Sequence, residues 1–206
     1  MRWLRGTCSH KLRFKGGYPL DVQIFTDASH ATNPDTRRSI TGVIIKVGGN
    51  TVKWLGLYQR IVSHSSSESE LMALDKGATV GQHIAWLMEL LGADVARPIS
   101  VYVDNQSAIL ISQNPVQPGR NVHIHARYYY VRDLVQIGEY IICHLRSEDQ
   151  IADLMCSYKT DANFWRLYGL TTGCARVELD NNVFAWNTSM LYWVGAGQVE
   201  WINLLI

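Results

Sequence analysis

Four acidic residues stand at points of the sequence where their carboxylates could meet in one site: Asp27, Glu70, Asp104 and Asp153. Asp27 and Asp104 each end a short apolar run with the pattern of a strand, and a helix pattern opens directly after Asp104. Ligands of open α/β sheets bind at the carboxyl ends of strands, so acids there are candidate ligand or metal residues. Taken singly, each acid could instead be a helix cap, a turn residue or a solvated surface group.

Four converging carboxylates would repel one another, and at neutral pH such a cluster holds either protons or cations. Carboxylate oxygens without histidine or cysteine partners favour hard divalent ions, Mg²⁺ above all, with Mn²⁺ as a substitute. Two such ions about 4 Å apart would stabilise the attacking and leaving oxygens of an in-line phosphoryl displacement. The chemistry suggested by these residue types is therefore metal-dependent hydrolysis of a phosphodiester.

The elements that must position these acids follow from the apolar periodicity of the chain. The first three expected strands form an antiparallel meander, whose second turn is Gly48-Gly49-Asn50. A long helix over residues 66–91 then returns the chain to a fourth strand, which should lie parallel to a neighbour. The five expected strands cover residues 21–27, 39–47, 51–58, 99–103 and 139–145.

The long helix carries two acids near its start, and only one of them can face the sheet. Glu68 and Glu70 are two residues apart, which places them about 200° apart around a helix axis. Glu70 continues into a stripe of small and apolar residues that suits close packing on a sheet. We therefore expect Glu70 to face the site; its stripe contains Ala73, Leu74, Gly77, Ala78, Gly81 and Ala85.

The last acid, Asp153, follows a capping-box pattern formed by Ser147 and Gln150, which predicts a helix with Asp153 about one turn inside it. Further helices are expected over residues 105–113, 122–137 and 161–168.

Composition narrows the class of protein without fixing its function. The chain has 206 residues, 47% of them apolar, and a formal net charge of +1, so a polyanion partner must be held by a local patch. Its four cysteines are scattered without a CxxC pair, which is typical of free thiols in a reducing compartment such as the cytoplasm or nucleus. We expect no secretory signal and no membrane segment.

The motifs IFTDAS, ESELMAL, VYVDNQSA and EDQIAD, in this order, resemble the ribonuclease H domain of copia-type LTR retrotransposon polyproteins. The resemblance implies a ribonuclease H-like α/β fold, with a mixed five-stranded sheet and helices on both faces. It implies hydrolysis of the RNA strand of an RNA–DNA hybrid with two Mg²⁺ ions, and the reverse transcriptase portion of the same polyprotein as a partner. The implied catalytic and metal-binding set is Asp27, Glu70, Asp104 and Asp153.

The resemblance also divides the chain. Residues 1–19 resemble the end of a reverse transcriptase, residues 20–170 form the ribonuclease H-like domain, and residues 171–206 are an unassigned tail. Contacts to nucleic acid, mostly to phosphates that position a duplex without reading its sequence, are expected from Arg37, Arg38, Asn105, Gln106, Arg120 and Arg127.

The sequence departs from the family pattern near the acids. Ser29-His30 replaces a tryptophan usual after the first aspartate, Leu57-Tyr58 replaces a lysine pair, and Cys156-Ser157 replaces a threonine-lysine pair. Two alternatives therefore stay open: a catalytically inactive remnant that acts only as a binding or structural module, and an integrase-like strand-transfer enzyme. The integrase class needs a different order of carboxylates, with a glutamate last.

Overall fold

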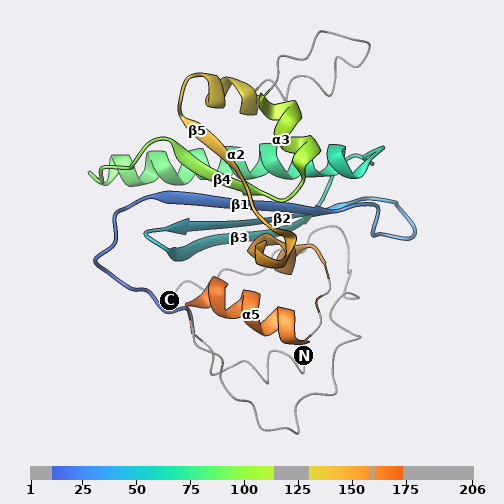
Figure 1. The fold of residues 1–206 in the computed structure, drawn as a ribbon, viewed down its shortest axis with the longest axis horizontal. Coiled ribbons are helices and arrows are strands. Elements are labelled where there is room, and N and C mark those ends of the chain that lie inside the picture. Colours follow the sequence, from blue (N-terminus) through green and yellow to red (C-terminus); the bar gives the residue numbers. More distant parts are fainter. Residues whose placement is uncertain (1–10, 114–129, 158, 160, 174–206) are drawn as a thin grey trace, which may run out of the picture.

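The computed structural model describes residues 11–113, 130–157, 159 and 161–173. They form one mixed sheet with the strand order β3-β2-β1-β4-β5 (Figure 1). The first three strands pair antiparallel, whereas β4 pairs parallel with both β1 and β5, as the sequence predicted. The strands are β1 (Val22–Ser29), β2 (Ile40–Val47), β3 (Asn50–Tyr58), β4 (Ile99–Val103) and β5 (Tyr140–His144).

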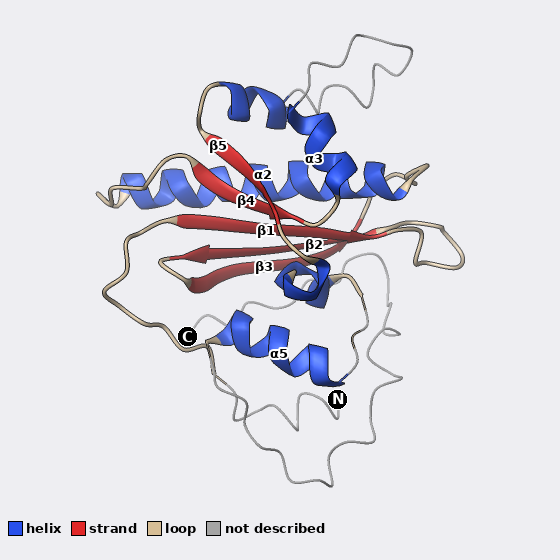
Figure 2. Ribbon diagram, in the orientation of Figure 1, coloured by secondary structure: helices blue, strands red, loops and turns tan. Residues whose placement is uncertain are grey.

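Helices cover both faces of this sheet, which confirms the predicted fold class (Figure 2). The long helix α2 packs with α3 on the face that contains Ile24 and Ile45, and the short helix η2 packs with α5 on the face that contains Ile44. The helices are α2 (Ser66–Leu90), α3 (Gln106–Gln113), η1 (Ser147–Asp149), η2 (Ile151–Met155) and α5 (Asp161–Thr172). Among the described residues, none of these helices is long and apolar enough to cross a membrane.

Two glycines let α2 lie close over the central strand. A Cβ on Gly77 would stand 2.2 Å from Thr26 Cγ2, and one on Gly81 would stand 2.1 Å from Ile24 Cδ1. Either contact is far shorter than van der Waals distance, so only glycine fits at both positions. The small-residue stripe predicted from the sequence is thus the surface with which α2 packs on β1, and it brings the first turn of α2 to the sheet.

Helix α5 is longer than the sequence predicted. It continues through Gly169 to Thr172, four residues beyond the expected end at Tyr168. The sheet holds this extra turn, because Lys46 Nζ donates to the Leu170 carbonyl at 2.7 Å and Thr51 Oγ1 donates to the Thr171 carbonyl at 2.5 Å. These distant partners outweigh the helix-stopping tendency of a glycine.

Two other predicted elements also differ. Instead of one helix beginning at the capping box, residues 147–155 form two short 3-10 helices, because the side chain of Gln150 turns into the protein interior. The expected helix over residues 122–137 is seen only as the helical residues 130–136, since residues 114–129 lie outside the described part.

The predicted lead-in is partly described and touches the domain. Arg13 N–H donates to the Thr172 carbonyl at 2.9 Å, and Lys15 N–H donates to Asn50 Oδ1 at 2.7 Å. The boundaries at residues 19 and 170 stay predictions, and the segments 1–10 and 174–206 lie outside the described residues.

Gly42 on β2 allows a test of how closely η2 packs against this strand. A Cβ there would stand 2.4 Å from the Ala152 carbonyl oxygen and 3.2 Å from Cys156 Sγ. We expect Gly42→Ala to lower the free energy of unfolding by about 1–3 kcal/mol, as overpacked cores do, in urea titrations. Gly16→Ala is the control, because nothing lies within 4 Å of its added Cβ. Equal stability of the two variants would contradict this packing.

Candidate active site

Asp27 and Asp104 lie where the neighbouring strands continue on opposite sides of β1. Strand β1 extends two residues past its predicted end at Asp27, to Ser29, whereas Asp104 directly follows β4. Strands β2 and β3 lie on one side of β1, and β4 and β5 lie on the other. Phe25 of β1 pairs with Tyr102 of β4, and each is followed two residues later by an acid, Asp27 or Asp104. Ligands bind at such a switch point because the ends of the two strands diverge there. Asp27 is buried and Asp104 is half-buried.

Gln150 holds these two strand ends at a fixed separation. Its side chain is fully buried, and Nε2 donates to the carbonyls of Thr26 at 3.0 Å and of Tyr102 at 3.2 Å. Its Oε1 accepts from Ala152 N–H at 3.3 Å, at the start of η2. One buried amide therefore links β1, β4 and η2 beside the acids. The sequence analysis assigned Gln150 only a capping role and missed this one.

The first turn of α2 supplies the third acid. Glu68 closes the start of the helix, because its Oε2 accepts from His64 N–H at 2.6 Å while its own N–H donates to Ser65 Oγ at 3.1 Å. Glu70 instead brings a carboxylate oxygen into one group with oxygens of Asp27 and Asp104, all within 4.8 Å of one another. The structure thus places Glu70 with the strand-end acids, as the periodicity predicted.

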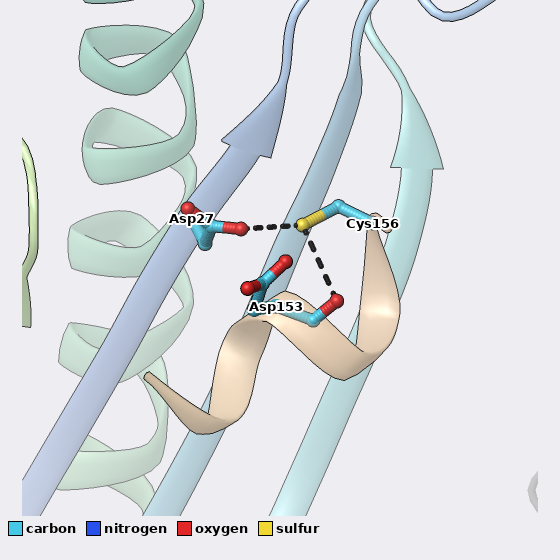
Figure 3. Close-up of side chains that lie close together, drawn as sticks. All are labelled: Asp27, Asp153 and Cys156. Carbon is cyan, nitrogen blue, oxygen red and sulfur yellow. Dashed lines mark hydrogen bonds between the residues drawn. The ribbon is translucent and has the colours of Figure 1, made fainter. Parts of the chain in front are cut away.

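The fourth acid reaches the same place from the opposite face of the sheet. Asp153 lies on η2, and its carboxylate forms a second group with Asp27 and Cys156, again within 4.8 Å (Figure 3). All four predicted acids therefore gather around Asp27, the member that both groups share. Ser157 Oγ donates to Asp153 Oδ1, and Lys159 forms an ion pair with the other oxygen of this carboxylate.

Cys156 is a member of the site that the sequence analysis noted only as a departure from a family pattern. Its Sγ donates to Asp27 Oδ2 at 2.7 Å and to the Asp153 carbonyl oxygen at 3.8 Å (Figure 3). The signal available in the sequence was its position three residues after Asp153, which puts both on one side of a short helix. Burial and the neighbouring acids raise the pKa of this thiol.

The acids at the centre of the cluster are costly to ionise together. Burial, together with the charges of Asp153 and Asp104, raises the pKa of Asp27 to about 7, although the hydrogen bond from Cys156 lowers it. Burial, followed by the charges of Asp27 and Asp104, raises the pKa of Glu70 to about 9. In the described part of the chain, Glu70 Oε2 is buried and has no hydrogen-bond partner.

This arrangement fits a divalent cation. Carboxylate oxygens from Asp27, Glu70 and Asp104 are the hard donors that Mg²⁺ prefers. A cation would also supply the missing partner of the Glu70 oxygen and favour the ionised carboxylates, against the burial and the repulsion that raise both pKa values. Without one, the cluster retains protons at neutral pH.

The predicted nucleic-acid contacts lie partly within the described residues. Arg37 and Arg38 are exposed in the loop after β1, and Gln106 is exposed at the start of α3. Asn105 caps α3, because its Oδ1 accepts from Ala108 N–H at 3.0 Å. Their roles in binding stay predictions, and two further predicted contacts, Arg120 and Arg127, lie outside the described residues.

Comparison with known proteins finds similarity to transposon polyproteins. No family model matches it. It is 32% identical over 155 residues to the retrovirus-related Pol polyprotein from transposon RE1 of Arabidopsis thaliana, which covers 75% of this chain. It is 31% identical over 158 residues to the corresponding polyprotein from transposon TNT 1-94 of Nicotiana tabacum, again over 75% of this chain. The chain is a relative of transposon Pol polyproteins. It spans 11% and 12% of the length of these two Pol proteins.

Solved ribonuclease H structures resemble this chain at lower sequence identity. LC11-RNase H1, isolated from compost, has a TM-score of 0.49 and 18% identity. The match covers 66% of this chain and 93% of the LC11-RNase H1 chain. The N-terminal RNase H domain of rv2228c from Mycobacterium tuberculosis has a TM-score of 0.49 and 12% identity. The match covers 66% of this chain and 91% of the solved chain.

The raised pKa values predict how stability depends on pH. A group with a higher pKa in the folded state binds more protons when folded, so stability falls as pH rises from its ordinary value to its folded value. For metal-free protein this window is about pH 4 to 7 for Asp27 and about pH 4.5 to 9 for Glu70. We expect urea titrations in chelator to show the unfolding free energy falling across both windows, by at most about 1.4 kcal/mol per unit of pKa shift for each group.

Glu70→Gln removes the most strongly shifted carboxyl while keeping its shape. We expect this variant to lose less stability between about pH 5 and pH 9 than the wild type, and to be the more stable protein at the upper end. Parallel pH profiles for the two proteins would contradict the proposed repulsion.

Proposed function

We propose that this chain is the ribonuclease H portion of a copia-type retrotransposon polyprotein, and that it hydrolyses the RNA strand of RNA–DNA hybrids endonucleolytically during reverse transcription. The observation that carries the proposal is the convergence of four carboxylates from β1, α2, β4 and η2 around Asp27. The relationship to transposon Pol polyproteins supports the same function, since reverse transcription produces such hybrids.

The proposed cofactor is a pair of Mg²⁺ ions, with Mn²⁺ as a substitute, held by Asp27, Glu70, Asp104 and Asp153. Bound metal would lower the pKa of a water molecule and stabilise the charge that develops on the leaving oxygen. The protein contributes orientation. Ser147 Oγ donates to Asp104 Oδ2 at 2.7 Å and so fixes one oxygen of this half-buried carboxylate, leaving the other free to bind a ligand.

Substrate selection in this proposal depends on shape and on the ribose hydroxyl rather than on base sequence. Exposed Arg37 and Arg38, on the loop after β1, and Gln106, at the start of α3, would contact the phosphate backbone. The reverse transcriptase portion of the same polyprotein would make further contacts with the hybrid. The proposed setting is the reducing interior of the host cell.

A second candidate is a catalytically inactive binding or structural module. The contacts that favour it are those of Cys156 and Lys159, which already occupy oxygens of Asp27 and Asp153. In such a module these contacts would stabilise the cluster permanently in place of metal.

Cleavage of an end-labelled RNA–DNA hybrid in Mg²⁺ separates the two candidates. We expect the wild-type chain to cut the RNA strand of the hybrid but not the same RNA alone. Asp104→Asn should lower the rate by about 100-fold or more, because it removes a metal ligand without changing shape. Asp94→Asn, an exposed aspartate before β4, is the matched control and should retain activity.

Cleavage that persists unchanged in Asp104→Asn would assign the activity to a contaminating nuclease. A folded wild-type protein that does not cleave would support the inactive module.

A further inference from the structure

The cluster contains one donor, the thiol of Cys156, that a hard-metal site does not need. Asp27, Asp153 and Cys156 are all buried, and one ligand atom from each lies within 4.8 Å of the others. Two oxygens and one sulfur form a mixed set, whereas Mg²⁺ takes oxygen ligands. Thiolate sulfur selects softer divalent ions such as Zn²⁺.

The spacing of these donors suits a tetrahedral ion. Zinc binds sulfur at about 2.3 Å and carboxylate oxygen at about 2.0–2.2 Å, so donors around it lie roughly 3.3–3.8 Å apart. Donor atoms that now lie within 4.8 Å would need to move by at most about 1.5 Å. Cys156 Sγ and Asp27 Oδ2 already share a proton at 2.7 Å, and a metal would replace that proton.

A separate observation indicates that this cluster is built to hold a cation. Glu70 is only 6% exposed, and its buried Oε2 has no hydrogen-bond partner among the described residues. A cluster that served only to fill the core would leave no buried carboxylate oxygen unsatisfied. Glu70 belongs to the set that shares Asp27 with Cys156, so a cation on Asp27 would lie beside it.

We propose that Asp27, Asp153 and Cys156 form a site for a thiophilic divalent cation, Zn²⁺ or its analogue Cd²⁺, with Cys156 bound as the thiolate. Binding breaks the S–H bond, forms a metal–sulfur bond and releases the proton to solvent, with no change of oxidation state. The ammonium of Lys159 leaves Asp153 in the same step. This binding does not depend on the proposed nuclease function.

One consequence does depend on that function. Because Asp27 belongs to both donor sets, a soft cation bound there would prevent the Mg²⁺ set from filling. If the chain is a nuclease, Zn²⁺ should inhibit it in competition with Mg²⁺.

Titration of the reduced full chain with Cd²⁺ tests the site without any activity assay. Cadmium–thiolate bonds absorb in the ultraviolet, and we expect the wild type to develop this absorption as its tightest site fills. Cys156→Ser should remove that absorption and weaken Cd²⁺ binding by about tenfold or more. Cys143→Ser is the matched control, because Cys143 lies on β5 and is also a free thiol.

Asp153→Asn provides a second variant that keeps the thiol. It should retain the thiolate absorption but shift its midpoint to higher Cd²⁺ concentration, with circular dichroism reporting that each variant is folded. Three outcomes would overturn the proposal: no thiolate absorption in the wild type, equal absorption in Cys156→Ser, or an equal loss in Cys143→Ser. A nuclease-inactive chain that still binds Cd²⁺ through Cys156 would retain this site and reject only the nuclease function.

Discussion

Repulsion between buried carboxylates around Asp27 is the constraint on which the rest of this structure depends. Asp27 and Glu70 are 7% and 6% exposed, and both have strongly raised pKa values because water cannot screen their charges. A protein whose core contained such a cluster for stability alone would gain by replacing it with apolar residues. The cluster is therefore best understood as a preformed cation site, whose cost in stability is offset by packing elsewhere.

Close packing of helix backbones against the sheet offsets this loss of stability. Gly77 and Gly81 seat α2 on β1, and Gly42 seats η2 on the opposite face, so the sheet end is enclosed from both sides. Gln150 then joins the diverging ends of β1 and β4. Each acid comes from a different element, so no local rearrangement can relieve the repulsion without breaking the packing that stabilises the fold.

Local periodicity was sufficient to predict much of this arrangement from the sequence. Alternation identified the strands that carry or precede Asp27 and Asp104, although β1 extends two residues past Asp27. The small-residue stripe identified Glu70 as the glutamate that turns toward the sheet. The contacts that complete the site are not local. Gln150 bonds to a carbonyl 124 residues away, and Cys156 to an acid 129 residues away.

The same limit explains the errors in the last third of the chain. A capping-box pattern predicted a regular helix with Asp153 about one turn inside it, but the buried partners of Gln150 determine the direction of its side chain instead. Gly169 predicted a helix end, but hydrogen bonds from Lys46 and Thr51 hold another turn in place. Both outcomes are set by tertiary contacts that no short pattern contains.

Calorimetric titration of the metal-free chain with Mg²⁺ tests the central claim most directly. A preformed cation site predicts binding that Glu70→Gln weakens by about tenfold or more, since this variant removes a ligand charge. Glu68→Gln, two residues earlier on the same helix, should bind Mg²⁺ like the wild type because Glu68 only caps the helix. Equal Mg²⁺ affinity in the two variants, or no binding by the folded wild type, would contradict the account.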